Sequence, residues 1–265
     1  MSPWERLLEQ SQSQGHFVQL YADESELARN AGHYLFHGLE RRHGVLAFVT
    51  PERQRLFCDY LSLLGAGVPA LIESRQLVFA DAQESLDRFM VSGEPDWQQF
   101  ENVIRGSMRQ LRPAGGAEGL RAYGEMVGIL WQEKRFAAAV RLEQFWNRLL
   151  AQAPFSLYCA YPIGVFDEEF EAGHLDGVLC SHTHLVPALP DGTLETALNR
   201  SMDEILGPQA GPLRHLVRTA CRPAWAVMPV AEATLLCLRK NLPEQADRIV
   251  RRARRHYQEL QPING

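Results

Sequence analysis

Short apolar segments alternate with longer amphipathic segments over the first 190 residues of the chain. Where almost every position of a short segment is apolar, a strand buried on both faces is predicted, as in a parallel sheet. Five segments have this character, at residues 17–21, 45–49, 77–79, 120–123 and 155–161. Amphipathic segments between them predict helices. This alternation indicates an α/β fold whose mostly parallel sheet is covered by helices on both faces.

Polar residues mark where the predicted helices begin. Asp23 or Ser25 is suited to cap the first helix, and Thr50 precedes a proline at the start of the second. Asp81 opens a capping box for a helix that includes Met90. Two further helices and the glycine- and proline-rich loop between them complete the region, at residues 97–111, 135–152 and 112–119.

The pattern changes near residue 190, where prolines divide the chain into short helical pieces without a strand signal. The last piece, residues 243–260, places apolar residues on one helical face and arginines elsewhere. We therefore expect two parts: an α/β domain over residues 14–190 and a helical C-terminal extension over residues 191–265.

Composition narrows the class of protein. Hydrophobic residues make up 46% of the chain and charged residues 22%, so a disordered, collagen-like or transmembrane protein is excluded. No apolar run approaches the ~20 residues that span a bilayer, and the N-terminus lacks the apolar core of a signal peptide. The five cysteines are scattered and contain no CxxC pair, so we expect a cytoplasmic protein without a disulfide framework.

Charge is distributed unevenly. The whole chain carries 27 − 32 = −5, whereas residues 211–265 hold ten basic and four acidic groups, or +6, which leaves −11 on the first 210 residues. A body this acidic repels the phosphate backbone, so nucleic acid is not an expected partner. The arginines of the last helix can instead contact an acidic partner or form a solvated face.

The turn after the first predicted strand is unsuited to a nucleotide. A phosphate loop needs glycines and a lysine, but residues 21–27 contain neither and carry three carboxylates, those of Asp23, Glu24 and Glu26. The first lysine of the chain is Lys134. Hydrolysis of ATP at a phosphate loop is therefore not expected. The GxSxG motif of a serine nucleophile is also absent.

Histidines and cysteines offer limited metal-binding potential at this level. His182 and His184 lie on the same side of an extended segment, and His33 and His37 are one helical turn apart. No nearby residue completes either set, so a third ligand would have to be distant in sequence. We interpret these histidines as hydrogen-bonded residues, and Cys159 and Cys180 as buried strand or loop thiols. We expect no metal and no cofactor.

Candidate ligand-binding residues cluster where predicted strands end, because open α/β sheets bind ligands at the carboxyl ends of their strands. The set combines aromatic and charged side chains suited to a small molecule. Packing in the core is the alternative for Trp146, and solvation is the alternative for Arg141. The candidates are Tyr21, Asp23, Arg121, Tyr123, Glu125, Trp131, Arg141, Trp146, Tyr161, His182 and His184.

Four segments resemble one family, the MEDS (methanogen/methylotroph, DcmR sensory) domain, in the expected order: residues 16–21, 44–52, 121–127 and 154–162. The resemblance covers about residues 14–190. It implies a RecA/KaiC-like three-layer sandwich that lacks a P-loop, and a sensory input module for small molecules such as hydrocarbon derivatives. Glu125 falls near the position where the ATPase relatives keep a Walker B carboxylate.

The sequence and the resemblance together favour a non-enzymatic module for signal transduction or transcription regulation. It would bind a small molecule or a partner such as a histidine kinase, a response regulator or another signalling protein, and the C-terminal helices would serve docking or homodimerisation. Two alternatives stay open. One is a metal-assisted hydrolase with Glu125 as general base and a metal at His182 and His184. The other is a regulator that contacts nucleic acid through the arginine-rich helix.

Overall fold

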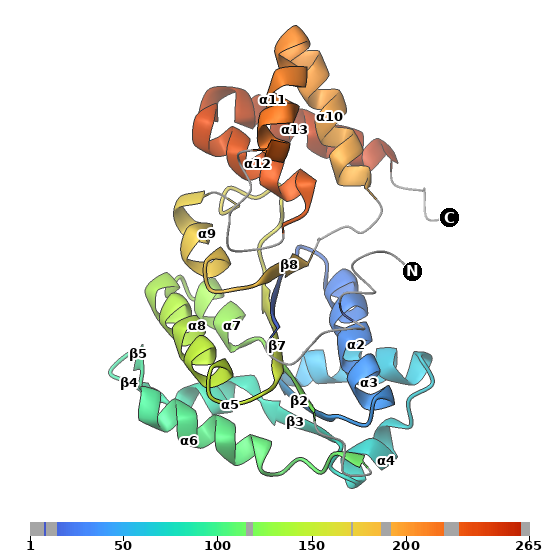
Figure 1. Cartoon of the computed structure of the whole chain (residues 1–265), viewed down its shortest axis with the longest axis vertical. Coiled ribbons are helices and arrows are strands. Elements are labelled where there is room, and N and C mark those ends of the chain that lie inside the picture. The colour runs from blue at the N-terminus through green and yellow to red at the C-terminus, as the bar shows by residue number, and fades with distance from the viewer. Residues whose placement is uncertain are drawn as a thin grey trace.

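A six-stranded parallel sheet organises the part of the chain that the structure describes. The computed structural model describes Leu8 and residues 15–114, 119–170, 172–186, 192–219 and 228–260. Within these residues the strand order is β3-β2-β6-β7-β1-β8, and every neighbouring pair is parallel (Figure 1). The strands are β1 (His16–Leu20), β2 (Gly44–Val49), β3 (Leu77–Asp81), β6 (Leu120–Gly124), β7 (Ser156–Tyr161) and β8 (His184–Val186).

Helices cover both faces of the sheet, so the domain has three layers, as expected. One face packs against α2 (Glu24–Glu40), α3 (Pro51–Leu63) and α4 (Val68–Glu73). The opposite face packs against α5 (Ala82–Asp87), α6 (Trp97–Met108), α7 (Met126–Gln132), α8 (Phe136–Leu150) and α9 (Ala172–Leu179). Alternate side chains of each strand enter opposite cores: Phe17 contributes to the α2 side and Val18 to the α8 side. Strands β1, β2 and β7 are therefore buried at every position, and β6 at every position except Leu120, which explains their largely apolar sequences.

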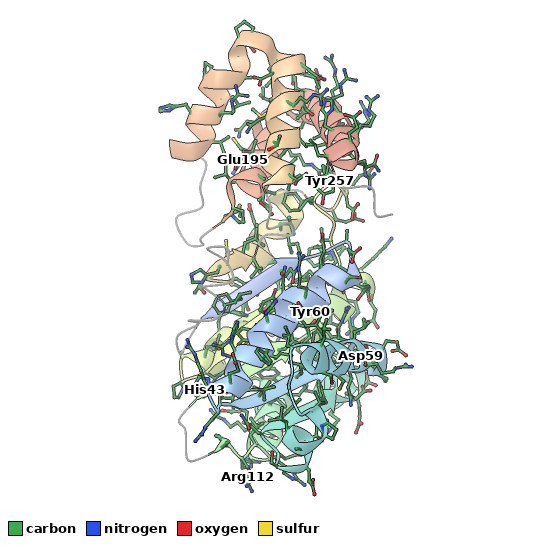
Figure 2. All side chains as sticks on the ribbon, turned by 90° about the vertical axis from the view of Figure 1, so that its right-hand side faces the viewer. His43, Asp59, Tyr60, Arg112, Glu195 and Tyr257 are labelled. Atoms are coloured by element: carbon green, nitrogen blue, oxygen red, sulfur yellow. The ribbon has the colours of Figure 1, made fainter. Side chains whose placement is uncertain are left out.

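The C-terminal region is helical, as predicted. It contains α10 (Thr193–Leu206), α11 (Ala210–Thr219), α12 (Val230–Asn241) and α13 (Pro243–Leu260), with a short 3-10 turn at Gly207–Gln209. These helices lie at one end of the molecule, beyond β8 and α9 (Figure 1). Figure 2 labels Tyr257 and Glu195 there, at the opposite end from Arg112. The bounds of α13 match the prediction, because its apolar face, which includes Ile249 and Ala253, is buried.

The sequence analysis is wrong at several short elements. The helix predicted to include Met90 ends at Asp87, and Met90–Val91 (β4) pairs antiparallel with Glu94–Pro95 (β5). Ser92 and Gly93 both have positive φ, of 52° and 87°, which is the backbone of a two-residue hairpin turn. Helices α4 and α7 and strand β8 were not predicted, and within the predicted 112–119 loop residues 115–118 lie outside the described residues.

No helix among the residues that the structure describes combines the length and the apolar character needed to cross a lipid bilayer.

Candidate functional site

A cleft opens at the carboxyl edge of the sheet, between β2 and β6. The chain leaves β2 toward β3 on one side and leaves β6 toward β7 on the other, so the strand order diverges at this point. Ligands of open α/β sheets bind at such a divergence. The cleft has a volume of about 360 Å³. It is lined by Tyr21, Glu24, Thr50, Glu52, Arg53, Leu56, Glu125, Gly128, Ile129 and Gln132.

A buried ion pair forms the wall of this cleft. Arg53 donates from Nε to Oε2 of Glu125 at 3.0 Å, and both side chains are largely buried. The second carboxylate oxygen of Glu125 accepts the backbone N–H of Thr50. Arg53 also donates to Tyr21 Oη at 3.1 Å and to the carboxylate of Glu24. Because Thr50 caps α3, it fixes Arg53 at the start of that helix, facing the cleft.

At two positions beside the cleft, the start of α2 and Thr50 before α3, carboxylates of the protein accept backbone N–H groups that could otherwise bind a phosphate. Helix N-termini carry free N–H groups and partial positive charge, which suit an anion. At the start of α2, Asp23 accepts from the N–H groups of Ser25 at 2.6 Å and Glu26 at 3.2 Å. Just before α3, the N–H of Thr50 donates to Glu125. The protein itself therefore supplies the anions at these positions.

The charge of the cleft also disfavours an anionic ligand. Its described lining contains three carboxylates, those of Glu24, Glu52 and Glu125, and one guanidinium, that of Arg53. Burial raises the pKa of Tyr21 to about 12, so its hydroxyl stays protonated at neutral pH. The cleft therefore presents a net negative charge together with neutral hydrogen-bonding groups.

A tyrosine of β6, Tyr123, lies close to the cleft residues Arg53 and Glu125. Tyr123 is fully buried, with its ring edge-on to Phe57 at a centroid distance of 4.9 Å. Burial raises its pKa well above the ordinary value, and the charge of Glu125 adds to the rise. Its Oη has no hydrogen-bond partner among the described residues. Buried polar groups are usually satisfied, so this hydroxyl marks an unused donor close to the cleft.

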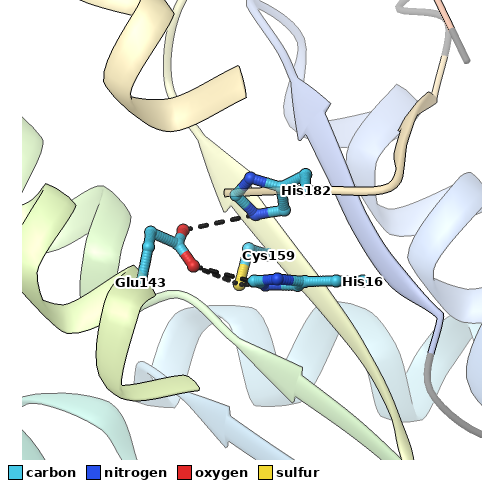
Figure 3. Close-up of side chains that lie close together, drawn as sticks. All are labelled: His16, Glu143, Cys159 and His182. Atoms are coloured by element: carbon cyan, nitrogen blue, oxygen red, sulfur yellow. Dashed lines mark hydrogen bonds and ion pairs between the residues drawn. The ribbon is translucent and has the colours of Figure 1, made fainter. Parts of the chain in front are cut away.

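A second group of chemically active side chains lies inside the protein, between the sheet and α8 (Figure 3). Its four members come from β1, α8, β7 and the turn before β8, and each is buried. One ligand atom from each lies within 4.8 Å of the others. The members are His16, Glu143, Cys159 and His182.

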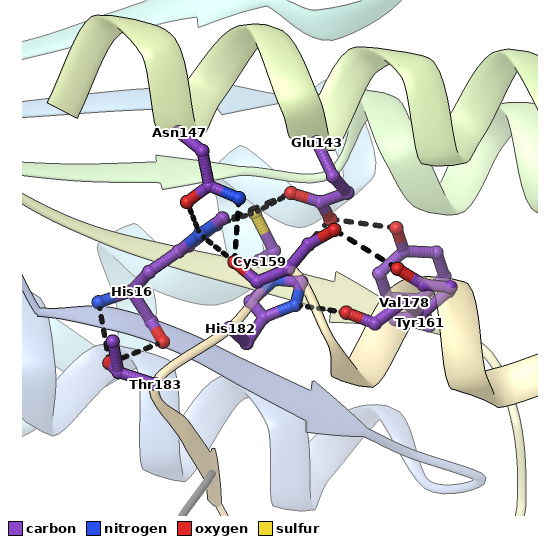
Figure 4. Close-up of polar contacts among 10 residues, drawn as sticks. His16, Glu143, Asn147, Cys159, Tyr161, Val178, His182 and Thr183 are labelled. Carbon is purple, nitrogen blue, oxygen red and sulfur yellow. Dashed lines mark hydrogen bonds and ion pairs between the residues drawn. The ribbon is translucent and has the colours of Figure 1, made fainter. Parts of the chain in front are cut away.

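The Glu143 carboxylate is the centre of this group. Its two oxygens lie 3.3 Å from the Nε2 atoms of His16 and His182. The Cys159 sulfur is 3.6 Å from Glu143 Oε2 and 3.5 Å from His16 Nε2. Tyr161 donates its hydroxyl to Glu143 Oε1 at 2.7 Å (Figure 4).

Outer hydrogen bonds fix both imidazole rings. His16 Nδ1 is 2.8 Å from the carbonyl oxygen of Ser181 and 3.0 Å from the side-chain oxygen of Asn147, so Nδ1 carries the proton. His182 Nδ1 is 2.7 Å from the carbonyl oxygen of Val178 and is likewise the donor (Figure 4). Both rings therefore direct Nε2 toward Glu143.

Burial dominates the ionisation of the group. It lowers the pKa of His16, and the neighbouring His182 lowers it further. It raises the pKa of the Cys159 thiol well above the ordinary value. Burial alone would raise the pKa of Glu143, but the two histidines outweigh it and hold that pKa below its usual range. This lowering requires an imidazolium, so it acts while one of the two histidine rings carries a second proton.

One family model matches this chain. The model for the MEthanogen/methylotroph, DcmR Sensory (MEDS) domain matches residues 15–183. The chain belongs to the MEDS family. Searches of curated proteins and of solved structures each gave no match. The matched MEDS region contains β1 to β7, every lining residue of the cleft and all four members of the buried group.

Three of the predicted site residues meet at the MEDS cleft or next to it. Tyr21 and Glu125 line it, and Tyr123 lies close to it. Asp23 is exposed nearby and serves as the cap of α2. Sequence reasoning did not select Arg53, although its place in the first turn after the Thr50 cap was visible.

Four other predicted site residues lie outside the lining of the cleft. The buried Arg121 donates to the backbone oxygen of Tyr34 at 2.6 Å, beneath α2. Trp131 and Trp146 are packed in the core, which for Trp146 was the alternative to ligand binding. Arg141 is exposed on α8, 3.8 Å from Glu94.

The predicted pairing of His182 with His184 is wrong. The backbone turns at residues 181–183, so alternation along an extended strand begins only at β8. His182 enters the buried group, whereas the His184 ring stacks on Phe17 at 5.1 Å. His33 and His37 stack at 6.0 Å, but their hydrogen bonds go to Tyr60 and Glu40.

The remaining members of the buried group were not predicted as a set. Tyr161 is next to it, as a donor to Glu143. Cys159 is buried, as expected, but Cys180 is exposed beyond the end of α9. His16 and Cys159 are 143 positions apart in the sequence, so their contact has no local sequence signal.

Proposed function

We propose that this MEDS chain is a non-enzymatic sensor that binds a small uncharged or cationic molecule in the cleft between β2 and β6. The observation that carries the proposal is the occupation of the phosphate-binding positions by carboxylates: Asp23 at the start of α2 and Glu125 on the N–H of Thr50. A nucleotide would have to displace both. The sensory role of the family supports the same conclusion.

The cleft suits a small ligand of mixed polarity. Its volume of about 360 Å³ is at the lower end of the range for small-molecule sites. Leu56 and Ile129 offer apolar contact, while Glu52 and Gln132 offer hydrogen-bonding groups. A cation or a neutral hydrogen-bond donor gains from the negative charge. A short-chain hydrocarbon derivative with one polar group has this chemistry.

A general-base role for Glu125 is less well supported. Both of its oxygens accept hydrogen bonds from Arg53 and Thr50, which position the carboxylate but occupy it. We therefore assign Glu125 to binding rather than to proton transfer.

A chain of contacts connects the cleft with the C-terminal helices. The N–H of Tyr21 donates to Tyr161 at the end of β7, and the next residue, Ala22, packs against Gly164. The segment that follows Gly164 is held by Arg239 of α12, which donates to the carbonyl oxygens of residues 167, 168 and 170. A ligand that favours one position of Tyr21 therefore acts on the packing of α12.

The C-terminal helices also carry an arginine-rich groove of about 550 Å³. It is lined by Glu204 and Ile205 of α10 and by Arg248, Arg251, Arg252 and Arg255 of α13, and Arg252 is paired with Glu204. We propose that this groove receives an acidic surface of a signalling protein. Salt-sensitive association abolished by R251E/R255E supports it, whereas a salt-insensitive homodimer would contradict it.

The ligand proposal is tested by thermal unfolding of the full chain with a defined panel: short-chain alcohols, amides, alkylammonium ions and Mg-ATP. A ligand at 100 times its Kd raises the free energy of unfolding by about 2.7 kcal/mol. We expect members of the first three classes to stabilise the protein and Mg-ATP not to. E125Q should abolish the shift, whereas E133Q, an exposed glutamate just beyond α7, should retain it. Stabilisation by Mg-ATP with phosphate release would overturn the proposal.

A further inference from the structure

We propose that four buried side chains form a closed, tetrahedral site for one divalent transition metal ion, for which zinc has the best-matched chemistry: His16, Glu143, Cys159 and His182. The site lies apart from the cleft and does not depend on the ligand proposed there.

The distances among the side chains match tetrahedral coordination. Zinc bonds of about 2.0–2.1 Å to nitrogen, 2.0–2.2 Å to oxygen and 2.3 Å to sulfur place tetrahedral ligand atoms about 3.3–3.7 Å apart. The Nε2 atoms of His16 and His182 are each 3.3 Å from a Glu143 oxygen. The Cys159 sulfur lies 3.5 Å from His16 Nε2 and 3.6 Å from Glu143 Oε2. The two histidines face different oxygens of Glu143, and all four ligand atoms lie within 4.8 Å of one another, so one ion requires either a bidentate carboxylate or a rotation of that carboxylate.

The hydrogen bonds around the two imidazoles are those of metal ligands. A ligating histidine binds the metal through one nitrogen and donates its other N–H to a carbonyl or carboxylate. His16 donates from Nδ1 to the Ser181 carbonyl, and His182 donates from Nδ1 to the Val178 carbonyl. His182 Nε2 is fully buried and has no hydrogen-bond partner among the described residues. It faces the Glu143 carboxylate, as Figure 3 shows.

The facing acceptor atoms also suit a cation. Because Nδ1 of each ring donates to a carbonyl oxygen, a neutral ring turns its Nε2 lone pair toward a Glu143 oxygen 3.3 Å away, so acceptor faces acceptor unless a proton or a metal ion lies between them. The Tyr161 hydroxyl donates to Glu143 at 2.7 Å, whereas the two Nε2 atoms lie 3.3 Å from the carboxylate. A divalent ion bound by Glu143, a Cys159 thiolate and two neutral histidines gives a site of zero net charge: +2 − 1 − 1 = 0. Binding releases the Cys159 proton to solvent.

Burial and ligand count indicate a structural metal. All four ligands come from the protein and none is exposed, so no coordination position stays open for a substrate. The ion would join β1, β7, α8 and the turn before β8, which are far apart in sequence. Its loss should therefore loosen the β8 edge of the sheet and its contact with α8.

Metal analysis and cobalt substitution of the full chain test the proposal. We expect purified protein to contain one zinc ion per chain. After chelation and dialysis, titration with Co²⁺ should give intense tetrahedral d–d bands and a sulfur-to-cobalt charge-transfer band, both saturating at one equivalent. Folded protein without bound metal, together with a Co²⁺ spectrum that lacks these bands, would overturn the site. The group would then be a protonated histidine–carboxylate network only.

Variants assign the ligands. C159S should remove the charge-transfer band, and C180S, which changes an exposed thiol two positions from His182, should retain it. N147A removes a side chain that positions His16, and we expect it to weaken Co²⁺ affinity about 10–100-fold while the bands persist. If C159S does not fold, the wild-type bands still decide the proposal. An equal charge-transfer band in folded C159S would refute the assignment of the sulfur ligand.

Discussion

The Arg53–Glu125 pair lends itself to a quantitative test, because one partner can be removed without the other. Arg53→Met keeps the apolar stem of the side chain and removes the guanidinium. The exposed fractions of the two side chains are 7% and 8%, so the variant leaves Glu125 buried with only the Thr50 N–H as a donor. Breaking a buried pair costs about 3–5 kcal/mol. We expect about 3 kcal/mol, because the remaining N–H still stabilises the carboxylate.

The assay is equilibrium urea unfolding, supported by the melting temperature. A loss of about 3 kcal/mol corresponds to a decrease in Tm of about 6–12 °C for a chain of this size. R53M/E125Q removes the stranded charge as well, so it should be at least about 1 kcal/mol more stable than R53M. The exposed pair of Arg55 and Glu52, 3.0 Å apart, provides the control, and R55M should cost less than about 0.5 kcal/mol.

Two results would refute this reasoning. A cost for R53M as small as that for R55M would mean that the pair is solvated in solution. A double variant less stable than R53M would mean that Glu125 is not stranded when the arginine is lost.

Three other changes have distinct expected results. Gly128→Ala places a Cβ 2.7 Å from the backbone of β7 and should destabilise the protein by about 1–3 kcal/mol in urea unfolding. Gly106→Ala, which has open space in α6, should stabilise it by up to about 1 kcal/mol. Equal effects of the two variants would contradict the packing. Arg252 lowers the pKa of Glu204 to about 2, below its unfolded value, so the stability that this carboxylate gives to α10 and α13 is present above pH 4.5 and lost as pH falls toward 2. E204Q should remove the pH dependence of helicity over that range, measured by circular dichroism. The same pH dependence in E204Q and the wild type would contradict the contact. Arg239→Met should increase hydrogen exchange in α12 and residues 163–170 but not in α6, and uniform exchange would contradict the docking role of Arg239.

Helices that begin at a capping side chain could be predicted from the sequence. Asp23, Thr50 and Asp81 all cap helices, because a capping oxygen needs only the next few backbone N–H groups. The α4 and α7 helices were missed because each is short and has no capping side chain. Tertiary packing determines such segments.

The candidate site shows the same division. Tyr21 and Glu125 could be selected because the carboxyl ends of parallel strands share one edge. Their partner Arg53 comes from the helix after another strand, so its contact depends on strand order. His182 was selected for the wrong reason, because its neighbour in sequence, His184, points to the opposite face. Glu143 and Cys159 reach His182 only through the order of the strands and helices in the fold, which the sequence pattern does not reveal.

Hydrogen exchange of the full chain, measured with a stabilising amide, alcohol or alkylammonium ion and separately with Mg-ATP, tests the sensor proposal most directly. The account predicts that the small ligand slows exchange at the cleft, in residues 21–27, 50–56 and 125–132, and changes exchange in residues 163–170 and in α12. Mg-ATP should leave all of these segments unchanged. Protection of residues 21–27 by Mg-ATP, or ligand protection confined to segments outside the cleft, would contradict it.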